Sequence, residues 1–307
     1  MATFAFPEIC VKLSSLHALI AAIEEGSLRA AARRIGVSQP ALTKMIRELE
    51  NELSTTLVSR STRGVVGTAQ GLVLYERSKA ADREISSAVE QIRQLEGTMT
   101  GSLTIAAVPL AVMLLIPETL RTFGREFPEM QMRVIEELYI EQLVRLRRGE
   151  VDVAVGPIPE HITPGEFVIE PLMPVEMMIV VRKGCELGKA TDLADLAGAS
   201  WVYTGDSSVS SYSRAHFERA GLEPPRIGAI VNSTLGLLSI IASSDHLCLL
   251  PRQLAMHPLA RSYLQIVDVA QGPVRLRIGA VTKFELAIKP AVRHLMAHLH
   301  RAAVQVT

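Results

Sequence analysis

The spacing of hydrophobic positions changes twice along the 307-residue chain. From Leu13 to about Leu53, apolar residues recur with a helical period, and short breaks fall at Gly26-Ser27 and Gly36-Val37. From Thr68 to Glu96 the sequence contains no proline, which predicts one long helix. From Gly101 onward, short apolar runs alternate with amphipathic segments. This alternation predicts an α/β region with largely parallel sheets.

The α/β region covers roughly 200 residues, which is enough for two small lobes. Its apolar runs predict strands at Leu103–Val108, Val151–Val155, Met177–Val181 and Trp201–Tyr203. Its amphipathic segments predict helices that include Leu110–Phe127, Tyr139–Arg148 and Ser211–Ala220.

Two helices joined by a tight turn are predicted between Ser27 and Leu53. Ser27 and Ser38 have the position of N-cap residues, and Gly36 supplies the turn between the helices. Pro40 falls in the first turn of the second helix, where its missing N–H costs little. The apolar stripe of that helix consists of Leu42, Met45, Ile46, Leu49 and Leu53. Because this stripe faces the core, the remaining polar side chains of the helix point outward.

The outward side chains have the chemistry of a DNA-reading helix. Gln39 and Thr43 are short polar groups near the helix N-terminus, as contacts with base edges in the major groove require. Cations suited to phosphate contacts surround them, namely Arg29, Arg33, Arg34, Lys44 and Arg47. A small hairpin of Leu57–Ser59 and Gly64–Val66 would carry Arg60 and Arg63 as a wing. Periodicity alone leaves open the alternative of an amphipathic helical hairpin with solvated arginines.

The net charge is zero, because 32 Lys and Arg residues balance 32 Asp and Glu residues. This balance excludes a protein that coats nucleic acid by bulk attraction. It conceals a local excess: between Leu28 and Gly64 there are seven cations and three anions, a difference of +4. A hydrophobic content of 48% excludes a disordered chain.

The compartment is predicted to be the cytoplasm. The three cysteines, Cys10, Cys185 and Cys248, are odd in number and far apart, which is typical of a reducing compartment. The start of the chain has no signal-peptide pattern, and the apolar stretch Leu103–Ile116 is shorter than the roughly 18–20 residues that span a bilayer. We therefore expect no membrane partner.

The segment from Ala31 to Glu50, with the sequence AARRIGVSQPALTKMIRELE, strongly resembles the LysR-type transcriptional regulators. Its Ser-Gln-Pro-Ala-Leu core is highly specific for that family, and Gly26-Ser27-Leu28 and Thr68-Ala69-Gln70-Gly71 continue the match. Ser54–Val58 departs from the family's frequent Gly-x-x-Leu-Phe, and Gly67-Thr68 stands where Leu-Thr is common. These departures affect the packing of the wing.

The resemblance in layout covers the whole chain and implies an α/β protein in three parts. Residues 1–67 would form a winged helix-turn-helix DNA-binding domain, 68–98 a linker and dimerisation helix, and 99–307 a periplasmic-binding-protein-like effector-binding domain. Its first lobe would comprise 101–169 and 272–307, and its second lobe 170–271. The predicted DNA-binding residues are Leu28, Arg29, Arg33, Arg34, Ser38, Gln39, Pro40, Thr43, Lys44, Arg47, Arg60 and Arg63.

The long helix carries a heptad-like series of apolar and small residues. Leu74, Ser78, Ala81, Ile85, Ala88, Ile92 and Leu95 follow one another in alternating steps of four and three. Such a seam suits a two-helix coiled coil, and the resemblance implies that the helix pairs two winged modules. The predicted dimerisation residues are Leu74, Ala81, Ile85, Ala88, Ile92 and Leu95. The alternative is that the helix packs on its own domain.

A ligand site is predicted where strands of the two lobes end beside helix N-termini. The expected effector-binding residues are Pro109, Leu110, Ala111, Tyr139, Ile140, Gly156, Thr204, Asn232, Ser233 and Thr234. Thr204 and the Asn232–Thr234 segment would donate to a small anion, and Pro109, Tyr139 and their neighbours would contact an apolar or aromatic body. Family members commonly have Ser or Thr after the first strand, where this chain has Pro109-Leu110-Ala111, so we expect a less polar floor. For any single residue, an ordinary cap or strand end is the alternative.

Enzyme chemistry is not indicated, because the sequence contains no GxSxG, GxxxxGK[ST], GxGxxG or HExxH motif. His294 and His298 are four residues apart on the last predicted helix, but no nearby carboxylate or cysteine completes a metal site, so we expect a solvated helix. Cys185 and Cys248 could imitate the disulfide switch of peroxide-sensing family members, but a buried Cys248 favours unreactive thiols.

The predicted function is therefore a DNA-binding transcriptional regulator, activator or repressor, controlled by a small organic metabolite of the organic-acid class, with aromatic acids among the candidates. The expected partners are a double-stranded DNA operator, the effector, further copies of the chain in a homodimer or homotetramer, and RNA polymerase. No cofactor or metal is expected. The alternative function is an α/β small-molecule-binding protein or enzyme whose helical N-terminus serves only for assembly.

Overall fold

The computed structural model describes residues 11–61, 64–158, 165–204, 212–284 and 288–306. The chain divides into two compact units, Met1–Val89 and Glu90–Thr307, which we call the N-terminal unit and the C-terminal unit. Within the described residues, no helix is long and apolar enough to cross a membrane.

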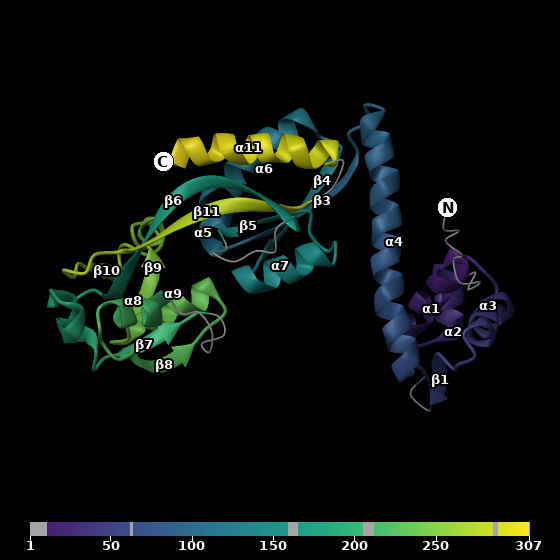
Figure 1. The fold of residues 1–307 in the computed structure, drawn as a ribbon, viewed down its shortest axis with the longest axis horizontal. Coiled ribbons are helices and arrows are strands. Elements are labelled where there is room, and N and C mark those ends of the chain that lie inside the picture. Colours follow the sequence, from purple (N-terminus) through teal and green to yellow (C-terminus); the bar gives the residue numbers. More distant parts are fainter. Residues whose placement is uncertain (1–10, 62–63, 159–164, 205–211, 285–287, 307) are drawn as a thin grey trace, which may run out of the picture. The chain divides into compact units, whose positions relative to one another are not determined.

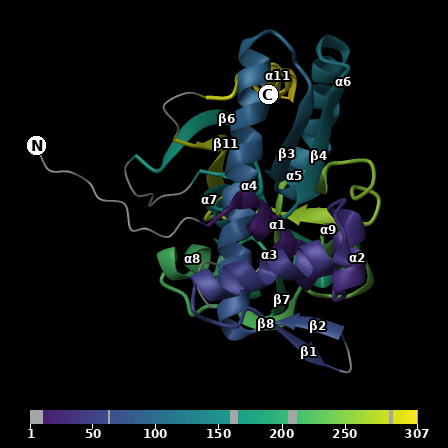
Figure 2. The same ribbon diagram turned by 90° about the vertical axis from the view of Figure 1, so that its right-hand side faces the viewer.

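The N-terminal unit is a three-helix cluster with a β-hairpin. Its elements are α1 (Leu13–Glu25), α2 (Leu28–Arg34), α3 (Gln39–Glu52), β1 (Val58–Ser61) and β2 (Gly64–Gly67), and α4 (Ala69–Leu95) follows. The side chains of Ser27 and Ser38 accept hydrogen bonds from Ala30 N and Ala41 N, so both serine N-caps are confirmed. Buried alanines of α1 and α2 pack against Leu42 and Ile46 of α3. Figure 2 shows this unit with the hairpin labelled.

Hydrogen bonds join the hairpin segment to the turn between α1 and α2 and to α3. Val65 N donates to Gly26 O over 2.8 Å, and Gly64 has φ +112°, where a Cβ would lie 2.3 Å from Gly26 O. On the other side, Glu50 Oε1 accepts from Leu57 N at 2.8 Å. These contacts fix the hairpin relative to α3.

The long helix α4 is anchored to the N-terminal unit by polar contacts. Thr68 Oγ1 accepts from Gly71 N at 3.0 Å, and a Cβ at Gly71 would lie 1.8 Å from Leu57 O, so the first turn packs directly on the preceding backbone. Glu24 of α1 accepts from Lys79 and from Tyr75, each at 2.8 Å, and pairs with Arg34 of α2 at 2.7 Å. Chiefly the Lys79 hydrogen bond lowers the pKa of Glu24 to about 2.

The C-terminal unit is an α/β structure in two lobes joined by two long strands (Figure 1). Its first part comprises β3 (Gly101–Ala107), α5 (Pro109–Leu114), α6 (Ile116–Glu126), β4 (Met130–Glu136), α7 (Tyr139–Arg147), β5 (Val153–Pro157) and β6 (Phe167–Arg182). There follow η1 (Glu186–Lys189), η2 (Leu193–Leu196), β7 (Ser200–Tyr203), α8 (Tyr212–Arg219), β8 (Arg226–Ile230), α9 (Thr234–Ser243), β9 (Cys248–Pro251) and α10 (Arg252–Ala255). The chain closes with β10 (Leu264–Val267), β11 (Val274–Lys283) and α11 (Pro290–Val306).

The expectation of largely parallel sheets is wrong for the main sheet. Its strand order is β10-β6-β11-β5-β3-β4, with β9 also paired to β6. Its parallel pairs, among the described residues, are β3 with β4 and β3 with β5. The strand β11 is antiparallel to β5 and β6, and β6 is also antiparallel to β9 and β10. The reason is that β6 and β11 carry the chain from one lobe to the other and back, in opposite directions. The smaller pair β7 and β8 is parallel.

The predicted helix Leu110–Phe127 is interrupted at Leu115, and α5 and α6 are separate helices. Pro117 explains the break, because proline lacks the N–H of a continuing helix and its ring clashes with the carbonyl four residues earlier. A continuous core cluster joins the lobes, with Val108 and Leu110 from one and Leu237 and Ile241 from the other.

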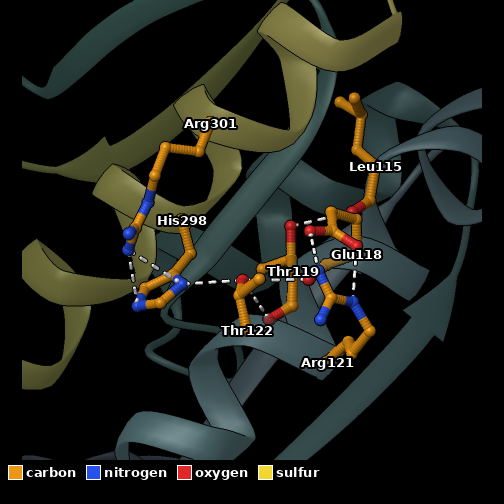
Figure 3. A network of polar contacts seen from close by, with 7 residues as sticks. All are labelled: Leu115, Glu118, Thr119, Arg121, Thr122, His298 and Arg301. Atoms are coloured by element: carbon orange, nitrogen blue, oxygen red, sulfur yellow. Dashed lines mark hydrogen bonds and ion pairs between the residues drawn. The ribbon is translucent and has the colours of Figure 1, made fainter.

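The last helix, α11, is not the solvated helix that the sequence suggested. It packs on α6, and His298 is 2% exposed. The Nδ1 atom of His298 lies 2.8 Å from Thr122 Oγ1, and Arg301 lies beside the ring (Figure 3). Glu126 Oε2 lies 3.2 Å from His298 Nε2. Burial lowers the pKa of His298 below its ordinary value. Within the described part of the chain, no group of three His, Cys, Asp or Glu residues is placed to hold a metal ion.

Candidate DNA-binding surface and effector site

The exposed face of α3 brings most of the predicted DNA-binding residues together. A groove on this face is lined by Gln39, Pro40, Thr43, Lys44, Arg47, Glu48 and Asn51. The Thr43 hydroxyl donates to Gln39 O at 2.9 Å, and the Ser38 side chain accepts from Ala41 N at 3.3 Å. Ser38 therefore holds the helix start, while Gln39 presents its amide at the first turn.

The cations around α3 differ in how far the protein already neutralises them. Arg29, Arg33 and Arg47 are exposed and have no ion-pair partner among the described residues. Arg34, in contrast, pairs with Glu24 at 2.7 Å and with Glu25 at 3.3 Å. The hydrogen bond to Glu24 is the main reason that the pKa of Arg34 is raised. Unpaired guanidinium groups are the ones available to phosphates.

Lys44 is partly neutralised, since its Nζ lies 3.7 Å from Glu48 Oε1 on the next turn. Arg60 belongs to β1, but its side chain, like the whole of Arg63, lies outside the described residues. Leu28 is a correction to the predicted surface. It is 8% exposed and packs in the helical core with Ala31 and Ile46, because it is the first residue of α2 and points inward. Its side chain cannot contact DNA.

In the C-terminal unit, the ends of strands from both lobes face one another. Ala107 at the end of β3 is in register with Glu136 of β4 and with Val155 of β5. In the second lobe, Val231 N donates to Tyr203 O at 2.9 Å where β7 and β8 end. The Thr234 hydroxyl donates to Glu136 Oε1 over 3.2 Å and connects the two groups. We call the surroundings of this hydrogen bond the interlobe junction.

Several predicted effector-binding residues lie at the interlobe junction. Ser233 caps α9 by accepting from Gly236 N at 3.2 Å, and Thr234 is the first residue of that helix. Thr204 and Asn232 are exposed next to the strand ends. Tyr139 and Ile140 begin α7, and their side chains lie outside the described residues. Pro109, half-buried, begins α5.

Leu110, Ala111 and Gly156 do not form the expected pocket floor. Leu110 and Ala111 are 3% and 1% exposed and belong to the hydrophobic core, because α5 turns this side of its first turn inward. Gly156 is buried in the sheet opposite Gly279. The prediction placed these residues by their position after a strand, which does not reveal the direction of a side chain.

Sequence reasoning missed two charged residues, one at the interlobe junction and one that connects the helices of the N-terminal unit. Glu136 is the last residue of β4, and the rule that ligands bind at carboxyl ends of strands would have pointed to it once β4 had been predicted. Glu24 connects α1, α2 and α4, and no local signal marks it, because its partners are up to 55 residues away.

Two family profiles match the chain. The profile described as bacterial regulatory helix-turn-helix protein, lysR family, matches residues 13–72, and the profile of the LysR substrate binding domain matches residues 96–304. The chain belongs to the LysR family. Members of this family are DNA-binding transcription regulators and not enzymes. A helical N-terminus that serves only for assembly is therefore set aside.

Relatives and solved structures agree with this family. The chain is 28% identical over 249 residues to the HTH-type transcriptional regulator GbpR of Azospirillum brasilense, covering 80% of this chain and 73% of the relative. It is 28% identical over 289 residues to the hydrogen peroxide-inducible genes activator of Pectobacterium carotovorum subsp. carotovorum, covering 84% and 95%. The fold is similar to that of CbnR in complex with its target DNA, with a TM-score of 0.69, 22% identity and coverage of 95% and 99%.

The linker helix of this LysR-type regulator has two different halves. Leu74 packs into the N-terminal core, and Ser78 is 2% exposed, so the first half of the predicted seam lies against its own unit. The second half is open: Ile85, Ile92 and Leu95 are 47%, 57% and 70% exposed, and Ala81 and Ala88 are exposed between them. Packing on its own domain therefore applies to the first half of the helix, and pairing through the second half stays a prediction.

The two described cysteines of this LysR-type regulator are buried. Cys185 is 6% exposed and Cys248 is 1% exposed. Burial raises the pKa of Cys248 to about 12, so the thiol stays protonated at neutral pH. A protonated thiol is a poor nucleophile, which argues against a disulfide switch at Cys248.

Proposed function

We propose that this LysR-type regulator changes its operator binding or its promoter activation when a small organic acid binds at the interlobe junction. The observation that carries the proposal is the hydrogen bond from the Thr234 hydroxyl to Glu136. It supports a carboxylate ligand, because a carboxylate oxygen already accepts from this hydroxyl. Pro109 and the α7 residues Tyr139 and Ile140 would contact the apolar or aromatic part of the acid.

The DNA contacts are assigned by the chemistry of the α3 face. Gln39 and Thr43 would contact base edges, while Arg29, Arg33 and Arg47 would hold phosphates, together with Arg34, Lys44, Arg60 and Arg63. Ser38 and Pro40 would place the helix start against the backbone of the DNA. This assignment is supported by the exposed, unpaired guanidinium groups beside the groove on α3.

The oligomer would form through the exposed half of α4. Ala81, Ile85, Ala88, Ile92 and Leu95 continue the four-three spacing of a coiled-coil seam, and their exposure supports pairing with a second copy. A homodimer pairs two reading helices, and further pairing would give a homotetramer. We propose 1–67, 68–98 and 99–307 as the functional divisions, in the cytoplasm. RNA polymerase would be a further partner where the operator position permits activation.

The mechanism would be a population shift. A bound effector favours one arrangement of the lobes, and the paired DNA-binding units then change their relative placement. Activation or repression would follow from the position of the operator relative to the promoter.

Selection of operators from a random DNA pool tests the proposal. The full chain should enrich a two-fold symmetric site whose half-sites lie about 10–10.5 base pairs, or a multiple of that, apart. A thermal-shift screen of organic acids, followed by operator binding with each acid that stabilises the protein, should find one that changes operator affinity. Failure to enrich any sequence, or binding acids that all leave operator affinity unchanged, would contradict the proposal.

A further inference from the structure

Among the described residues, the strand ends and turns that form the interlobe junction carry acidic side chains and no basic side chain. The segments that meet there are 107–109, 135–140, 155–158, 203–204 and 230–236. Their sequences contain Glu136 and Glu137, and neither lysine nor arginine. A site built for an acid alone would be expected to supply a cation, as carboxylate sites commonly do with arginine.

Glu136 and Glu137 differ in how the protein compensates them. Arg145 of α7 lies 2.8 Å from Glu137 Oε2, and this hydrogen bond is the main cause of the raised pKa of Arg145. Glu136 is exposed and has no ion-pair partner among the described residues. Within the described residues, its carboxylate accepts a hydrogen bond only from the neutral hydroxyl of Thr234. Glu136 thus leaves a full negative charge at the junction.

A buried acceptor follows Glu136 closely along the chain. Gln142, in the first turn of α7, is 0% exposed, and its Nε2 donates to Glu137 O at 2.7 Å. Its Oε1 is buried and has no hydrogen-bond donor. Buried acceptors are rarely left without a donor. The end of β4 and the first turn of α7 therefore leave one carboxylate without a cation, Glu136, and one acceptor without a donor, Gln142 Oε1.

A ligand with a carboxylate alone would be poorly matched to this charge distribution. To take over the Thr234 hydroxyl it would have to displace Glu136, and the two like charges would then lie a few ångströms apart and repel each other. A ligand with an ammonium group beside its carboxylate meets both needs. The ammonium pairs with Glu136, and the carboxylate accepts the hydroxyl that Glu136 releases.

We propose that the effector is a small zwitterion of the α-amino-acid class, with its ammonium group on Glu136 and its carboxylate on the hydroxyl of Thr234. This inference rests on the proposed function, since it names the ligand of the same junction. Glu136 is then the residue that selects amino acids over the corresponding acids without an amino group. The hydrogen bond between Glu136 and Thr234 is exchanged for two bonds to the ligand.

Matched ligands test the proposal on the full chain. The probes are the twenty proteinogenic L-amino acids and, for each side chain, the acid without the amino group and the amine without the carboxylate. Thermal shift identifies binders, and calorimetry gives their dissociation constants. At least one amino acid should bind, and its deaminated acid and its amine should each bind at least about 10-fold more weakly.

Two variants separate Glu136 from its neighbours. Glu136→Gln removes the charge at an exposed position and should lower the affinity for the amino acid at least about 10-fold. The protein's preference for the amino acid over the deaminated acid should then shrink or reverse. Glu141→Gln, at another exposed carboxylate of α7, should leave both affinities unchanged. Unchanged operator binding without ligand will show that each variant is folded.

The proposal is overturned if no amino acid binds, if a deaminated acid binds the wild-type chain as tightly as its amino acid, or if Glu136→Gln keeps the wild-type preference. An acid without an amino group that binds and changes operator affinity would overturn this inference and leave the proposed function intact. Ligands that bind without any effect on operator affinity would instead contradict the proposed function.

Discussion

The α3 face of the N-terminal unit and the interlobe junction of the C-terminal unit carry uncompensated charge of opposite sign. Among the described residues, Arg33 of α2 and Arg47 of α3 are exposed without an ion pair, and Glu136 at the junction has no cationic partner. Glu24, in contrast, is a compensated charge, because it contacts Lys79, Tyr75 and Arg34. Under the proposed function, the chain pairs its structural charges internally, and the unpaired charges are the ones that DNA or a ligand would pair.

The two surfaces also differ in how many copies of the chain they need. Glu136 and Thr234 belong to one chain, so the junction is complete in a single protomer. In the proposed assignment, the α3 face of one chain contacts one half-site, and a symmetric operator needs two such faces. Separate variants can therefore test the pairing of two copies, the role of the unpaired cations and the role of the internal ion pairs.

Ile92→Glu should weaken operator binding and leave ligand binding at the interlobe junction unchanged. Ile92 is 57% exposed on the open half of α4, and a charge there opposes coiled-coil pairing. Loss of the second copy removes avidity, so operator affinity should fall at least about 100-fold. Analytical ultracentrifugation should show a smaller assembly, while the thermal shift with a bound ligand stays the same.

The matched control is Val73→Glu, because Val73 is 67% exposed on α4 but lies outside the four-three series. This variant should keep the wild-type assembly and operator affinity. Dissociation by Val73→Glu, or a wild-type assembly with Ile92→Glu, would show that the seam lies elsewhere.

Arg33→Ala should lower the salt dependence of DNA binding, because Arg33 is a cation without an ion-pair partner among the described residues. A lost phosphate contact lowers the slope of log affinity against log salt concentration by about 0.9, or by about 2 for a dimer that makes the contact twice. Affinity should fall about 10-fold at low salt, on operator and random DNA alike. Fluorescence anisotropy across a salt series measures both quantities.

Arg34→Ala is the comparison variant, because Glu24 and Glu25 already neutralise Arg34. Its salt slope should change less than that of Arg33→Ala. Equal slopes for the two variants would refute the idea that internal pairing decides which cations face DNA.

Glu24→Gln should affect stability and neither binding surface. The expected loss in the free energy of unfolding is about 1 kcal/mol at neutral pH, since the partners of Glu24 are partly solvent-exposed. The folded-state pKa of about 2 lies below the ordinary value of 4.5, so the carboxylate stabilises the fold above about pH 4.5, and this stabilisation is lost as the pH falls towards 2. Urea unfolding from pH 7 to pH 2.5 should therefore show a shrinking difference between wild type and variant. A difference that is constant with pH would contradict this role.

The helix-turn-helix was predictable because its signals are local. Ser27, Ser38 and Pro40 mark helix starts within a few residues, and the apolar stripe of α3 follows from its period. The hairpin and the long helix were predicted for the same reason. The resemblance to the LysR family then decided between DNA binding and a solvated helical hairpin, which periodicity could not separate.

The parts that sequence reasoning missed depend on residues far apart in the chain. The Glu136–Thr234 bond spans 98 residues, and no local pattern shows that the two meet. Leu110 stood beside a strand end and was assigned to the ligand site, although α5 turns it into the core. His298 was assigned to a solvated helix because the period of α11 does not reveal that α6 covers it.

The most direct test of the account is the sequence preference of Gln39→Ala at one salt concentration. Gln39 is uncharged and exposed at the first turn of α3, so its loss should remove base recognition and keep the attraction to phosphates. A lost bidentate contact costs about 1–3 kcal/mol per half-site. Operator affinity should therefore fall at least about 10-fold, while affinity for random DNA changes less than about twofold. An unchanged operator affinity, or an equal fall on both DNAs, would contradict the assignment of α3 as the reading helix.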